Sequence, residues 1–207
     1  MARKINTRET RQPKKRAVGA GITEYWYLKH IKSLPGFDFE LKPRFFGNES
    51  MANINKLIDK AYEDGAPVVC FYDEDVKQWN QVEAQRIKDL HDKYDNDDSV
   101  TLACSMPSIE YWFLLHFQNY TELIKTNGNA IGILAPHIKT WFSSDKKLSK
   151  ILKSEKYIKS PHWVENLCAD GKLELAIQRA ENNINTAKEN NDLDNQSYTY
   201  VYKLFKP

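Results

Sequence analysis

Residues 67–75 read Pro67-Val68-Val69-Cys70-Phe71-Tyr72-Asp73-Glu74-Asp75, an apolar run that ends in three acidic residues. Gly65 lies just before the run and marks a turn at that end. A continuous apolar run of this length is typical of a parallel strand that is buried on both faces. The sequence therefore predicts a central strand that ends in an acidic cluster.

Strand and helix patterns alternate on both sides of this run. The further strand patterns fall at residues 17–18, 37–41 and 100–104. The helix patterns fall at residues 23–31, 50–64, 76–94 and 108–117. Alternation of this kind predicts an α/β fold with a mostly parallel sheet that is covered by helices on both faces.

The 207 residues, of which 41% are hydrophobic, suit one domain with a full core. Residues 1–15 are predicted to form a basic, flexible tail, and residues 16–120 to form the α/β core. From Tyr120 onward no strand pattern is evident, so residues 121–207 are predicted to form a helical region packed on the core. Its clearest helix patterns fall at residues 172–190 and 198–205.

Composition indicates a soluble, cytoplasmic protein. No apolar run approaches the roughly 20 residues that cross a bilayer, and the N-terminus lacks the apolar core of a secretory signal. No membrane association is therefore expected. The three cysteines are odd in number and far apart, which favours reduced thiols.

Basic residues are concentrated near the N-terminus although the net charge is only +2. Residues 3–16 contain one acidic residue, Glu9, and seven cationic residues: Arg3, Lys4, Arg8, Arg11, Lys14, Lys15 and Arg16. Such a segment suits nucleic-acid phosphates, whose binding depends on counterion release. A solvated leader is the alternative. Lys146, Lys147 and Lys150 form a second basic run, which either contacts phosphates or forms a solvated face.

The acidic cluster indicates a metal site. Ligands of parallel α/β sheets bind beyond the carboxyl ends of the strands, where Asp73 and Asp75 are predicted to lie. Residues two apart on an extended chain lie roughly 6 to 7 Å apart, and two such charges repel by about 2 to 3 kcal/mol. A divalent cation would reverse that sign, and carboxylates suit Mg²⁺ better than Zn²⁺. The alternative is that both aspartates end the strand and cap the next helix.

Glu110 adds a third carboxylate close to the next predicted strand. It lies within the apolar stretch 109–117, where a charge is costly unless it is paired or bound to a metal. The alternative is a partly exposed residue in the first turn of a helix. The five histidines show no zinc-ligand spacing and are expected to be structural or solvated.

Three stretches together resemble one family. They are Gly21-Ile22-Thr23-Glu24, Phe71-Tyr72-Asp73-Glu74-Asp75, and Ser105-Met106-Pro107-Ser108-Ile109-Glu110-Tyr111-Trp112-Phe113-Leu114-Leu115-His116-Phe117. They are similar to the RloB-like proteins of bacterial antiphage defence loci, which are related to the Toprim nuclease domain and include AbiL-type abortive infection systems. The third stretch is the specific one, and weaker similarity at 176–180 and 198–205 extends the resemblance over most of the chain.

The resemblance implies a Toprim-like fold and cleavage of phosphodiester bonds with Mg²⁺ or Mn²⁺. Asp73 and Asp75 match the metal-binding pair, and Glu24 and Glu110 match further acidic positions of the site, Glu110 as an additional metal ligand. The implied substrate is RNA, such as tRNA, or DNA. The implied partner is an ATPase encoded at the same defence locus.

Position 20 departs from the family pattern. Family members usually read Glu-Gly after the first strand, whereas this chain reads Ala20-Gly21. In Toprim enzymes that glutamate is a metal ligand or a general acid/base, so the nuclease activity is expected to be disabled in this chain. Natural loss and a deliberate change from glutamate both explain the alanine, and the intact remaining acidic set favours the second. The rival hypothesis is a catalytically silent module that binds nucleic acid or the ATPase.

Overall fold

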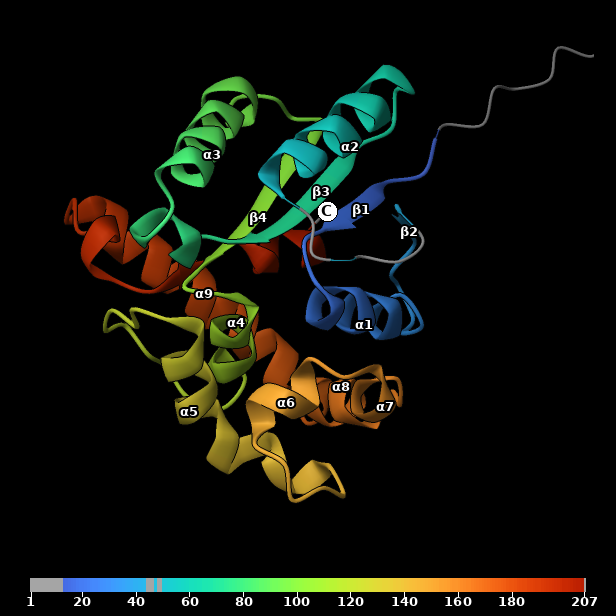
Figure 1. The fold of residues 1–207 in the computed structure, drawn as a ribbon, viewed down its shortest axis with the longest axis vertical. Helices are drawn as coiled ribbons and strands as arrows, with labels where there is room; N and C mark the ends of the chain where they lie inside the picture. The colour runs from blue at the N-terminus through green and yellow to red at the C-terminus, as the bar shows by residue number, and fades with distance from the viewer. Residues whose placement is uncertain (1–12, 44–46, 48–49, 207) are drawn as a thin grey trace, which may run out of the picture.

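The centre of the molecule is a sheet that carries helices on both faces (Figure 1). A computed structural model describes residues 13–43, 47 and 50–206. Within these residues the strand order is β2-β1-β3-β4-β5. The strands are β1 (Arg16–Gly19), β2 (Glu40–Leu41), β3 (Val68–Asp73), β4 (Val100–Met106) and β5 (Tyr198–Thr199). β1 to β4 are mutually parallel and β5 is antiparallel to β4, which confirms the predicted mostly parallel α/β class.

Most of the described helices follow β4 in the chain. The α-helices are α1 (Ile22–Ile31), α2 (Met51–Glu63), α3 (Gln81–Tyr94), α4 (Ile109–Leu115), α5 (Asn127–Ile138), α6 (Leu148–Leu152), α7 (Glu155–Ile158), α8 (His162–Cys168) and α9 (Lys172–Glu189). Short 3₁₀ helices are η1 (Asp75–Gln78), η2 (Lys139–Trp141), η3 (Leu193–Asn195) and η4 (Val201–Phe205). The predicted C-terminal helical region is therefore confirmed. None of the helices in the described ranges has the length and apolarity to cross a membrane.

The two faces of the sheet have separate apolar cores. Side chains alternate between the faces of a strand, and β3 follows this rule. Val69 and Phe71 pack with α1, α4 and the C-terminal helices. Cys70 and Tyr72 pack with α2 and α3 on the other face. Burial on both faces explains why β3 reads as a continuous apolar run.

Capping side chains set the boundaries of α2 and α3. The Ser50 hydroxyl accepts a hydrogen bond from the Asn53 amide at 3.4 Å, as the predicted cap requires. The Asn80 side chain accepts from the amides of Val82 and Glu83, so α3 begins at Gln81. The prediction of a single helix over residues 76–94 was therefore wrong at its start. Asn80 caps a new helix, and the residues before it form the separate 3₁₀ helix η1.

The expectation that strands stop at Tyr120 was wrong. Residues 198–205 form β5 and η4 rather than an α-helix. β5 pairs with β4, and the hydroxyls of Thr199 and Ser105 lie 2.7 Å apart in a hydrogen bond. A strand of two residues has little local signal because tertiary partners hold it. The predicted strand 37–41 is likewise shorter, since pairing with β1 covers Glu40–Leu41 alone.

Candidate functional site

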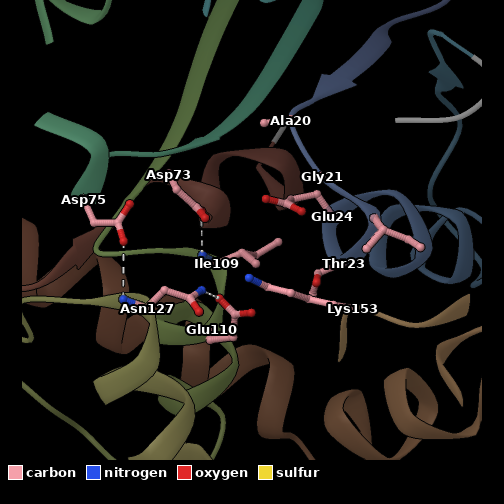
Figure 2. Close-up of a pocket in the computed structure, with 11 residues that line it drawn as sticks. Ala20, Gly21, Thr23, Glu24, Asp73, Asp75, Ile109, Glu110, Asn127 and Lys153 are labelled. Carbon is pink, nitrogen blue, oxygen red and sulfur yellow. Dashed lines mark hydrogen bonds between the residues drawn. The ribbon is translucent and has the colours of Figure 1, made fainter. Parts of the chain in front are cut away.

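A cavity of about 470 Å³ opens beyond the carboxyl ends of β1, β3 and β4 (Figure 2). It is lined by Ala20, Gly21, Ile22, Thr23, Glu24, Asp73, Asp75, Ile109, Glu110, Asn127 and Lys153. The structure thus brings together all five residues predicted for the catalytic site. They come from three separate strand-to-helix connections, as the crevice rule for parallel sheets predicts.

Asp73 and Asp75 occupy the end of the central strand. Asp73 is the last residue of β3, and its Oδ1 accepts a hydrogen bond from the Ile109 amide at 3.0 Å. Asp75 begins η1, and its Oδ2 accepts from the Asn127 amide at 3.4 Å. Neither carboxylate forms an ion pair within 4.0 Å with a described lysine, arginine or histidine. Both carboxylates therefore remain available to a ligand in the cavity.

Glu110 lies in the first turn of α4 and is 2% exposed. Its Oε2 accepts hydrogen bonds from the Ser108 hydroxyl and from the Asn127 side-chain amide, each at 2.7 Å. The partly exposed alternative for Glu110 was therefore wrong. These donors fix the Oε2 oxygen of a carboxylate that lines the cavity.

Glu24 lies in the first turn of α1 and is 5% exposed. Its carboxylate folds back over Gly21, where there is no room for a side chain: a Cβ on Gly21 would lie 2.6 Å from Glu24 Oε2. The backbone of Gly21 is extended, with φ −142°, so the glycine serves close approach rather than an unusual dihedral angle. Glycine at this position lets the Glu24 carboxylate line the cavity.

The pKa values of all four carboxylates are raised, and the charge of a neighbouring carboxylate adds to the rise at Glu24, Asp73 and Glu110. Burial is the largest cause of the raised pKa at each of the four carboxylates. It raises the pKa of Glu24 to about 7, with the charge of Glu110 adding to the rise. The pKa of Asp73 is raised well above its usual range by burial and then by the charges of Glu24, Glu110 and Asp75. Burial also raises the pKa of Asp75 and of Glu110. Full ionisation is therefore costly, and a bound cation would offset the cost.

Asn127 and Lys153 were missed by the sequence reasoning. Both come from the helical region, Asn127 from the start of α5 and Lys153 from the end of α6. Asn127 joins two site segments by contacting Asp75 and Glu110. The signals in the sequence were weak, because an Asn after a Thr cap and a lysine in a lysine-rich stretch are both common on surfaces.

Ala20 lines the cavity beside Gly21, at the point where the resemblance expects a glutamate. The position therefore faces the carboxylates, and its methyl group supplies no ligand. The predicted roles of the five residues remain predictions, because the structure fixes their places and not their chemistry.

The predicted nucleic-acid contacts are dispersed. Lys14 pairs with Asp38 and Arg16 with Asp64, both at 2.7 Å, and Arg16 begins β1 at the end opposite the cavity. Lys15 is partly buried, whereas Lys146 and Lys147 are exposed. Arg11 and most of the predicted tail lie outside the described residues.

A second polar cluster lies on the α3 side of the sheet. Glu74, His91 and Cys104 offer ligand atoms within 4.8 Å of one another, a donor set that could hold a metal ion. Glu74 is 1% exposed. Burial alone would raise its pKa, but hydrogen bonds from His91 and Lys77 outweigh burial and lower the pKa to about 2. His91 therefore belongs to a buried polar network, which its sequence spacing did not indicate.

The fold and site together define a mostly parallel α/β protein with a carboxylate-lined cavity at the carboxyl edge of its sheet. A family model described as RloB-like protein matches residues 17–206. The chain belongs to the RloB-like family, as the sequence resemblance indicated. No curated protein and no solved structure matches the chain.

Proposed function

We propose that the chain is a Toprim-like, magnesium-dependent nuclease of RNA or DNA and an effector of an antiphage defence system, with its cleavage activity disabled here by Ala20. The observation that carries the proposal is the convergence of Glu24, Asp73, Asp75 and Glu110 on one cavity. Four carboxylates in one lining are costly without a counter-charge. The defence role and an ATPase partner rest on the sequence resemblance.

The donor set fits Mg²⁺ or Mn²⁺. Hard divalent cations prefer carboxylate oxygens and water, and the raised pKa of Asp73 reflects a cost that such a cation would offset. Asp73, Asp75 and Glu110 would hold the ion. A metal bound there would supply positive charge at a phosphodiester group and lower the pKa of a bound water.

The protein's own groups supply orientation and a proton acceptor. The Ile109 amide orients Asp73, and Asn127 orients both Asp75 and Glu110. Glu24, with its pKa raised to about 7, is suited to accept or release a proton at its carboxylate near neutral pH. Ala20 contributes no carboxylate, so we propose that cleavage is disabled in the chain as it stands.

A catalytically silent module is the second candidate, and Ala20 is the observation that favours it. In that case the cavity or the basic tail would bind nucleic acid or the ATPase without cleavage. The two candidates differ in what a glutamate at position 20 should do, because a nuclease regains a ligand or a base and a silent module does not.

The test compares Ala20→Glu with the unchanged chain on labelled tRNA, single-stranded DNA and duplex DNA, with Mg²⁺ and with EDTA. Asp73→Ala on the Ala20→Glu background is the matched control. We expect Ala20→Glu to cleave in the presence of Mg²⁺ but not in EDTA, and we expect the double variant to cleave in neither. A folded Ala20→Glu protein that leaves every substrate intact would favour the silent module.

A further inference from the structure

Lys153 brings a positive charge from the helical region into the acidic cavity. It follows the last residue of α6 and lines the cavity together with the four carboxylates. Figure 2 shows its side chain extending into the cavity toward them. Yet it forms no ion pair within 4.0 Å with any carboxylate in the described parts of the chain. The ammonium group is therefore near the carboxylates without being held by one of them.

The backbone at Lys153 is anchored to the core of the site. The Thr23 hydroxyl donates a hydrogen bond to the Leu152 carbonyl at 3.1 Å, and the Leu152 side chain is fully buried. Thr23 directly precedes Glu24 on α1. The contact therefore fixes the segment that carries Lys153 relative to the segment that carries Glu24. The packed fold therefore places the backbone of Lys153 beside the cavity, and its exposed side chain extends from that fixed point (Figure 2).

The Lys153 ammonium group offsets part of the negative charge of the cavity. Burial raises the pKa of Glu24, Asp75 and Glu110, and the charge of Lys153 opposes that rise at all three. Four acidic side chains against one ammonium group would still repel an anionic phosphate by simple electrostatics. Of the described residues that line the cavity, Lys153 alone carries a positive charge that attracts an anion.

Further lysines extend outward from Lys153 on the surface of α6 and α7. They recur at every third position, and all are exposed: Lys147, Lys150, Lys156 and Lys159. None forms an ion pair within 4.0 Å with a described carboxylate. Figure 1 shows that α6 and α7 lie on the same side of the sheet as α1, the helix whose first turn carries Glu24. The surface thus carries unpaired positive charge that leads to the acidic site.

We propose that Lys153 binds a substrate phosphate at the acidic cavity and that the flanking lysines bind neighbouring phosphates of the same single strand. The inference rests on the proposed function, because it assigns the contacts of that function's substrate. Lysine acts as a mobile point charge on phosphate. The arrangement selects a polyanionic strand over a mononucleotide, since several contacts outside the cavity add to the one within it.

The test measures binding of a fluorescently labelled 12-nucleotide single strand, as RNA and as DNA, by anisotropy over a range of salt concentrations. Lys153→Gln is the test variant and Lys153→Arg the conservative one. Lys60→Gln on α2 is the matched control, because that lysine is exposed on the other face of the sheet. Mn²⁺ binding to each protein is measured in parallel by electron paramagnetic resonance.

We expect Lys153→Gln to weaken strand binding by about tenfold, as loss of a charged hydrogen bond does. Its salt slope should fall by about 0.7, the value for one phosphate contact on a single strand. Lys153→Arg and Lys60→Gln should bind nearly as the unchanged chain does. Mn²⁺ affinity should be equal or higher in Lys153→Gln, because a repulsive charge is removed.

Two results would overturn the inference. If Lys153→Gln binds the strand as tightly as Lys60→Gln while its Mn²⁺ affinity rises, Lys153 is a counter-ion of the carboxylates and not a phosphate ligand. If the unchanged chain binds no strand, the phosphate contacts do not exist, whatever the metal does. A third result would separate the two proposals. If none of the four proteins binds Mn²⁺ but Lys153→Gln still weakens strand binding, the result counts against the proposed nuclease and supports the phosphate contact.

Discussion

Replacing Glu24 with glutamine should stabilise the metal-free protein at high pH. Burial and the charge of Glu110 raise the pKa of Glu24 from 4.5 to about 7. The folded state therefore binds a proton more tightly than the unfolded state, so stability is lost as pH rises from 4.5 to 7. At about 1.4 kcal/mol per pH unit, the loss reaches about 3 kcal/mol. Glu24→Gln removes the ionisable group and should recover that amount above pH 7.

The assay is urea unfolding in EDTA at pH 5 and at pH 8. At pH 8 Glu24→Gln should be more stable than the unchanged chain by up to about 3 kcal/mol. At pH 5 the difference should fall below about 1 kcal/mol, because Glu24 is still protonated in the folded state and only the unfolded state has begun to ionise. Glu189→Gln, on the exposed end of α9, is the matched control and should show no such pH dependence. An equal effect of Glu24→Gln at both pH values would refute the reasoning.

Two further variants test how the site is held. Gly21→Ala should leave the fold intact but displace the Glu24 carboxylate, because the new Cβ would lie 2.6 Å from its oxygen. Mn²⁺ binding should therefore weaken about tenfold. The control Gly132→Ala, at a position with open space in α5, should leave Mn²⁺ binding unchanged and raise stability by about 1 kcal/mol. Asn127→Ala should also weaken Mn²⁺ binding about tenfold, since it removes the amide that orients Glu110, and unchanged affinity in a titration would contradict that role.

The core of the fold was predictable because its signals are local. β3 is buried on both faces, so its residues read as one apolar run. Parallel strands bring their carboxyl ends to one edge, and from this rule Asp73, Asp75 and Glu110 could be expected to meet. The cap at Ser50 was visible for the same reason, since an N-cap acts within its own turn.

The remainder depends on contacts between distant segments. β5 is held by pairing with β4, including the hydrogen bond of the Ser105 hydroxyl, and the sequence of residues 198–199 does not indicate this pairing. Asn127 reaches Glu110 because α5 packs on α4, and Lys153 reaches the cavity because Leu152 is bonded to Thr23, 129 positions away in the chain. Such pairings follow from tertiary packing, which no local pattern of one sequence encodes.

Calorimetric titration of Mn²⁺ into the EDTA-treated chain and into Asp73→Asn, at pH 7.5, tests most directly whether the acidic cavity is a metal site. The unchanged chain should bind the ion despite Ala20. Binding should also release protons, because Glu24 has a pKa of about 7 and is partly protonated before the ion arrives, so the measured heat should differ between Tris and HEPES buffers. Asp73→Asn should lose this binding. Equal Mn²⁺ affinity in the two proteins would contradict the assignment of the cavity as a metal site.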